Sequence, residues 1–194
     1  MKKLVIAALL AAGIVGVSAQ GWDPSMGNTS MNLVSQTGYV TYGESAALVD
    51  PALVGTRIGS DFTGVIYYND AVVATCNFGS VEKNGEIVNT GRLAGGVVYT
   101  DLVPANADVE LVVGAYNSWV DGATTEAEGA AGATFMGKSN PFEYATGDQA
   151  SAPPTPCGDL MNFDQFTVEY IPEPTTIALG ILGLGGLFLL RRRS

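Results

Sequence analysis

Short β-rich runs separated by turn residues fill the chain between residues 22 and 171, and this pattern limits the fold more than any other feature. An Asn-Asp pair at 69–70 separates the runs 62–68 and 71–77, and an Asn-Gly pair at 84–85 interrupts a second apolar region. Asn, Asp and Gly tolerate the positive φ that two-residue hairpin turns require. Both stretches therefore predict β-hairpins.

Further strands are predicted at 96–100, 108–116 and 166–170 because apolar and polar residues alternate there with a period of two. The inward positions expected for the two longest of these runs are Val109, Leu111, Val113 and Ala115, and Phe166, Val168 and Tyr170. Helical periodicity is confined to residues 124–132, where glycines limit its length. Short strands without intervening helices predict an all-β fold, an antiparallel β-sandwich or jelly-roll-like single domain spanning residues 20–171.

Residues 1–19 have the pattern of a secretory signal peptide. Lys2 and Lys3 precede an apolar run of 14 residues, and Ala19 ends the Val-Ser-Ala sequence that a signal peptidase recognises. A retained membrane helix is the alternative, but about 20 residues are needed to span a bilayer. We expect cleavage between Ala19 and Gln20 and export of the body.

The body is strongly acidic. Residues 20–174 contain four basic residues against 19 acidic ones. Binding to nucleic acid depends on Lys and Arg displacing counterions from phosphates, so a nucleic-acid partner is excluded.

Two cysteines, Cys76 and Cys157, lie in the exported region. In an oxidising compartment the favoured state is a disulfide closing a loop of about 80 residues, which contributes about 4 kcal/mol in the loop-entropy model. Two free thiols, or a bond between chains, are the alternatives.

The stretch 175–190 contains no charged residue and is followed by the basic tail 191–194. As a helix its 16 residues reach about 24 Å, short of a ~30 Å hydrocarbon core, so it spans a membrane only with local adjustment. Arginine stays on the cytoplasmic side, which predicts a transmembrane helix with a cytoplasmic C-terminus. A permanent anchor and a temporary one both remain open.

Pro172-Glu173-Pro174, followed by the apolar segment and the arginines, resembles the PEP-CTERM sorting signal of exported bacterial proteins. The resemblance covers residues 171–194, with 172–194 as the sorting and anchor segment, and implies processing near these three residues by an exosortase, a membrane-embedded peptidase. It further implies a transient hold in the inner membrane, then delivery to the cell surface or to the exopolysaccharide of the biofilm matrix. Segments 115–117, 137–142 and 163–168 resemble the β-sandwich ectodomains that precede such tails, a resemblance that implies a fold but no ligand.

The body shows no catalytic or metal-binding motif. The chain contains no histidine, which excludes Ser-His-Asp and Cys-His catalysis. Carboxylates could still hydrolyse glycosides or bind calcium, but none stands in a spaced array. We expect no enzymatic activity and no cofactor, with calcium as the minor alternative.

Aromatic side chains could instead stack on sugars. The candidates for glycan contact are Tyr116, at the end of the strand 108–116, and Trp119, three residues after it. The sequence therefore predicts an exported structural protein of the cell surface or extracellular matrix, associated with exopolysaccharide. The alternative is a carbohydrate-binding module that recognises that polysaccharide.

Overall fold

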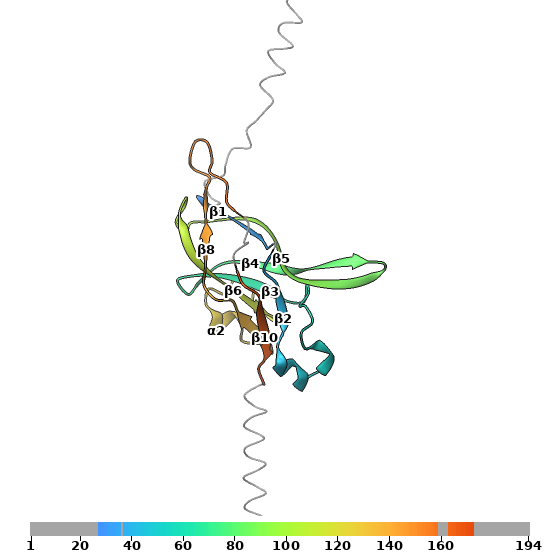
Figure 1. The fold of residues 1–194 in the computed structure, drawn as a ribbon. Helices are drawn as coiled ribbons and strands as arrows, with labels where there is room; N and C mark the ends of the chain where they lie inside the picture. The colour runs from blue at the N-terminus through green and yellow to red at the C-terminus, as the bar shows by residue number, and fades with distance from the viewer. Residues whose placement is uncertain (1–26, 36, 159–162, 173–194) are drawn as a thin grey trace, which may run out of the picture.

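The computed structural model describes residues 27–35, 37–158 and 163–172 (Figure 1). The predicted signal peptide 1–19 and the segment 173–194 lie outside the described residues. None of the described helices is long and apolar enough to cross a membrane.

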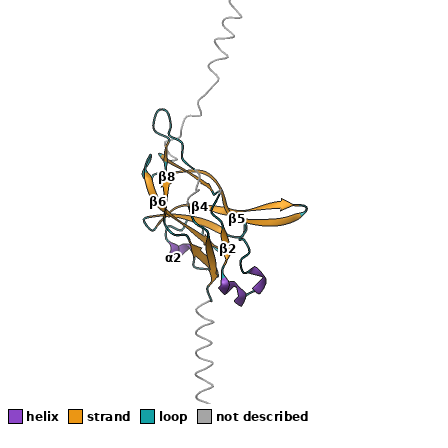
Figure 2. Cartoon of the chain, viewed as in Figure 1, coloured by secondary structure: helices purple, strands orange, loops and turns teal. Residues whose placement is uncertain are grey.

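Strands make up 49% of the structure and helices 9%, which confirms the all-β prediction (Figure 2). The strands are β1 (Thr29–Val34), β2 (Val40–Tyr42), β3 (Thr63–Tyr68), β4 (Ala71–Lys83), β5 (Glu86–Thr100), β6 (Asp108–Tyr116), β7 (Phe135–Lys138), β8 (Phe142–Ala145), β9 (Gly147–Asp148) and β10 (Phe166–Tyr170). Among the described residues, the helices are the 3₁₀ turns η2 (Glu44–Leu48) and η3 (Pro51–Leu53), and the single-turn α2 (Glu126–Gly129).

The ten strands of the described ranges belong to one hydrogen-bonded sheet in the order β2-β10-β7-β6-β3-β4-β5-β1-β9, with β8 paired to β6 beside this path. The pairings are antiparallel, as predicted, except that β10 runs parallel to β2. β4 pairs with β3 along its first half and with β5 along its second half. β5 then pairs with β1 along its own second half. These two long strands thus link separate parts of the sheet.

The two predicted hairpins are confirmed. Asn69 and Asp70 join β3 to β4 with φ of 48° and 63°, and Asn84 and Gly85 join β4 to β5 with φ of 56° and 81°. Left-handed backbone at both turn positions matches the twist of the flanking strands. The local turn chemistry therefore fixes the register of both hairpins.

The main core lies on one face of β6. The four predicted inward side chains, Val109, Leu111, Val113 and Ala115, are at most 6% exposed and belong to one apolar cluster. Side chains from β1, β4, β8 and β10 complete this cluster. Because strands far apart in the sheet order share one core, the sheet must curve round it.

A second, smaller cluster covers the other face of β3 and β6. It is built on Val65, Tyr67 and Tyr116 and is covered by residues of the segment 119–136, which includes α2. Tyr67 and its neighbour Tyr68 pack against different clusters, as expected for consecutive strand residues. The end of β6 is thus buried on both faces.

The curvature brings β2, at one end of the strand order, against β5. The N–H of Ile58 donates to the carbonyl of Val40 (3.2 Å), and the N–H of Gly91 donates to the carbonyl of Ile58 (2.9 Å). Gly91 has φ of 64°, and a Cβ there would lie 2.4 Å from the Val40 oxygen. This contact requires glycine both for its conformation and for space.

We predict that Gly91→Ala destabilises the domain far more than Gly85→Ala does. Both glycines have positive φ, which costs about 1–2 kcal/mol for alanine, but a Cβ at Gly85 meets open space. The backbone clash at Gly91 should add roughly 1–3 kcal/mol. Urea unfolding of both variants measures the difference; equal losses would show that the contact between β2 and β5 carries no such constraint.

Candidate functional site

The junction between the folded domain and the predicted processing motif is formed by the end of β10. This strand lies between β2 and β7, with Val168 fully buried in the core. After it, the N–H of Ile171 still donates to the carbonyl of Thr134 (2.8 Å). Ile171 is 39% exposed and belongs to no strand, so the chain leaves the sheet within two residues of Tyr170.

A carboxylate holds this end of β10 to the turn η2. Glu169 accepts hydrogen bonds from the N–H of Ser45 (3.1 Å) and from its hydroxyl, and from the hydroxyl of Thr167 (3.2 Å). The Ser45 oxygen in turn accepts from the N–H of Tyr170 (2.6 Å). Gly43 leaves room for this arrangement, because a Cβ at that position would overlap the carboxylate.

These hydrogen bonds, chiefly that from the Ser45 hydroxyl, lower the pKa of Glu169 because they favour its ionised form. We call the contact between Glu169 and Ser45 the β10 clamp. Glu169 lies three positions before Pro172, the first residue of the predicted processing motif, and Pro172 is half-buried. The other predicted processing residues, Glu173, Pro174, Ala19 and Gln20, lie outside the described residues.

Tyr116, predicted to contact a glycan, is fully buried instead. Its hydroxyl accepts from the hydroxyl of Tyr67 (2.9 Å) and donates to Glu126 of α2 (2.7 Å). Glu126 also pairs with Lys138 (2.6 Å). The chain of hydrogen bonds thus ties β3 and β6 to α2 and β7.

Burial and both hydrogen bonds raise the pKa of Tyr116, and burial raises the pKa of Tyr67 to about 12. Burial opposes ionisation of Glu126, but the hydrogen bonds from Lys138 and Tyr116 outweigh it and lower its pKa. The tyrosines therefore stay neutral and the carboxylate ionised at neutral pH. This is the charge arrangement of a structural network whose tyrosines are buried and whose ion pair is partly exposed.

Trp119 packs on the same cluster. Its ring lies 4.9 Å from the ring of Tyr116 at 47°, and it takes up the space that a Cβ on Gly129 would need. The indole Nε1 is buried and makes no hydrogen bond within the described structure. The pair Trp119 and Tyr116 therefore does not form an exposed stacking platform, and the expectation of a glycan contact at Tyr116 is corrected by its complete burial.

The structure does not contain the predicted disulfide between Cys76 and Cys157, and both cysteines are free thiols in it. Each packs against the main apolar core, as a small hydrophobic side chain does. Burial raises the pKa of Cys76 to about 12, although a backbone hydrogen bond from Gly95 opposes the shift. Cys76 is therefore held almost entirely as the thiol, which is a poor nucleophile.

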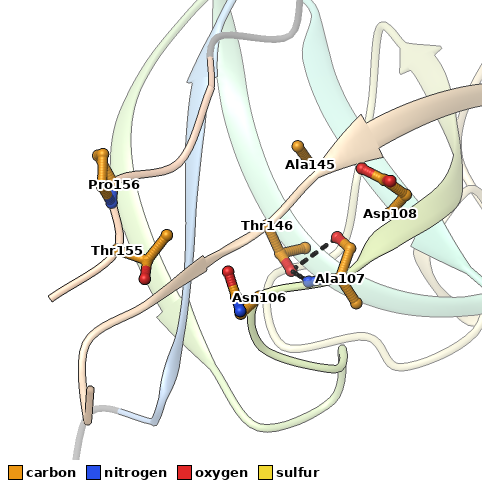
Figure 3. A pocket seen from close by; sticks show the side chains of 7 residues that line it. All are labelled: Asn106, Ala107, Asp108, Ala145, Thr146, Thr155 and Pro156. Atoms are coloured by element: carbon orange, nitrogen blue, oxygen red, sulfur yellow. Dashed lines mark hydrogen bonds between the residues drawn. The ribbon is translucent and has the colours of Figure 1, made fainter.

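A pocket of about 260 Å³ lies where the start of β6 meets the segment after β8 (Figure 3). It is lined by Asn106, Ala107, Asp108, Ala145, Thr146, Thr155 and Pro156. The Thr146 hydroxyl accepts a hydrogen bond from the N–H of Ala107 (3.0 Å) and donates one to the carbonyl of Pro104 (2.8 Å). Its hydrogen bonds therefore hold the backbone before β6 in place. Across the described ranges, no three Asp, Glu, Cys or His side chains come together in an arrangement suited to a metal ion.

A family model for the PEP-CTERM protein-sorting motif matches residues 171–194. No curated protein and no solved structure matches the chain. The motif marks an exported protein that is sorted by an exosortase, itself a membrane protein. The match begins at Ile171, directly after the strand held by the β10 clamp.

We predict that Glu169→Gln weakens the domain at neutral pH by about 1 kcal/mol, a small value because solvent screens this exposed carboxylate. A carboxylate with a lowered folded-state pKa stabilises the fold above its unfolded pKa, and this stabilisation is lost as pH falls through the folded pKa. The difference between Glu169→Gln and the parent should therefore vanish in acid. Thermal unfolding between pH 7 and pH 3 measures it, with the exposed hairpin variant Glu82→Gln as control.

A second prediction concerns the thiols. Intact-mass measurement after alkylation in denaturant, without reductant, should show two labelled cysteines in the exported protein and one in Cys76→Ser. If the cysteines were labelled only after reduction, the disulfide expected from the sequence would be present in the exported protein.

Proposed function

We propose that the exported and sorted chain is a non-enzymatic structural protein of the cell surface or extracellular matrix, associated with exopolysaccharide. One observation carries the proposal: the sorting motif follows the last strand of the β-domain without a linker. The product that sorting delivers is therefore the folded domain itself. Its acidic surface and the lack of histidine in the chain favour a structural over a catalytic role.

The short junction limits where processing takes place. Four residues lie between Tyr170 and Thr175, where the apolar stretch begins, so the two Cα atoms are at most about 18 Å apart when the chain is fully extended. The domain must therefore lie next to the membrane surface while the tail holds it. Cleavage near Pro172, Glu173 and Pro174 would free the domain without removing a strand.

Carbohydrate recognition by Trp119 and Tyr116 has less support as an alternative. Tyr116 is fully buried, and Trp119 is packed against it and Gly129. An association with exopolysaccharide would use another surface. Binding to a panel of polysaccharides that is unchanged in Trp119→Ala would agree with this view, whereas loss of binding would favour the lectin-like alternative.

We predict that the surface form begins at Gln20 and ends near Pro174, and that replacing Pro172, Glu173 and Pro174 by alanine leaves the tail uncut. Cell fractionation with intact-mass measurement tests both, in cells with and without the exosortase. The exposed-loop variant Asp121→Ala is the control and should be processed normally. A surface form that still carries Arg191, or normal processing of the triple variant, would overturn the proposal.

A further inference from the structure

The β4–β5 hairpin projects from the domain (Figure 1). Every residue from Val81 to Asn89 is exposed, including Val81 (52%), Ile87 (74%) and Val88 (42%). Within the described structure, residues 81–88 form no hydrogen bond outside the hairpin. This two-stranded extension therefore has an open edge on each side.

The turn decides which backbone groups face the open edge. Lys83 and Glu86 flank the two-residue turn and are opposite each other in the ladder. In such a hairpin this pair exchanges hydrogen bonds, and the pattern alternates along the strands. The N–H and C=O of Ile87 consequently point away from β4, at the free edge of β5.

We propose that this edge pairs with the same edge of a second copy of the chain, antiparallel, about a two-fold axis at Ile87. Each Ile87 then donates its N–H to the carbonyl of the other, and the two hairpins form a four-stranded sheet. The most exposed apolar side chain of the hairpin packs against its own copy. The surface is thus self-complementary, as a two-fold interface requires.

The charges agree with a second copy as the partner. The domain as a whole is strongly acidic and repels its copies, but in this register Glu86 faces Val88 of the other hairpin, so no like charges are opposed. The β4 edge is less suitable because a two-fold axis at Glu82 would set two carboxylates opposite each other. Self-pairing is therefore specific to β5.

The projection also keeps the acidic bodies apart. The hairpin leaves the domain near Thr90, about 10 Å from Ile87 at roughly 3.3 Å per residue, so the two bodies lie about 20 Å apart across the axis. The screening length at physiological salt is ~8 Å. Repulsion between the bodies is thus weak where the edges meet.

Cysteine cross-linking of the full chain in the producing cells tests the pairing. In this geometry the two Ile87 Cα atoms lie about 5.5 Å apart, within disulfide range, and the outer β4 strands lie about 14 Å apart, beyond it. We expect Ile87→Cys to give at least tenfold more disulfide-linked dimer than Val81→Cys, its exposed control. Equal cross-linking of the two, or none, overturns the proposal.

A second variant removes the pairing without breaking the hairpin. Ile87→Pro deletes an N–H that β4 does not use, so the ladder between β4 and β5 should persist. The purified full chain in detergent should change from dimer to monomer mass by light scattering, whereas Ile87→Thr should remain dimeric. A dimer that survives Ile87→Pro contradicts pairing through this edge. The measurement does not depend on tail processing, so its outcome is separate from that of the proposed function.

Discussion

Burial of the C-terminal half of β6 on both faces is the constraint on which the rest of the structure depends. Its alternate residues Val109 to Ala115 lie in the main core, while Val112 and Tyr116 on the other face lie under α2 and the following segment. A strand covered on both faces needs neighbouring segments that contribute side chains to the apolar cluster on each face. β3, β7 and β8 all pair with it, and the sheet curves from this point toward the contact between β2 and β5.

The sequence predicted those features whose cause is local. The hairpin turns at 69–70 and 84–85 were predictable because the residues themselves favour left-handed backbone, and the bounds of β6 and β10 followed from a period-two pattern. The short helices η2 and η3 were not expected. Pro51 and the Asp50 side chain, which accepts from the N–H of Ala52, start η3, but such signals fit a turn equally well.

The candidate sites were less predictable because their contacts join distant residues. Glu169 and Ser45 are 124 positions apart, and nothing in either local sequence indicates that they meet. Tyr116 ends a strand, which suggested exposure, yet the later α2 covers it. The cysteines share this difficulty, since spacing in the sequence does not show whether two thiols lie within bonding distance. Only the PEP-CTERM motif was readable directly, because its signal is a continuous stretch of sequence.

The position of β10 connects folding to sorting. The last strand is inserted between β2 and β7 rather than added at an edge, and its parallel pairing with β2 joins residues about 126 positions apart. Because β10 is the last of the described strands in chain order, this long-range pairing forms only once the chain is available as far as Tyr170. The sorting motif begins one residue later. In the proposed route, a tail that held the chain at the membrane would give the last strand time to enter the sheet, and cleavage beyond Pro172 would leave the described hydrogen bonds of β10 in place.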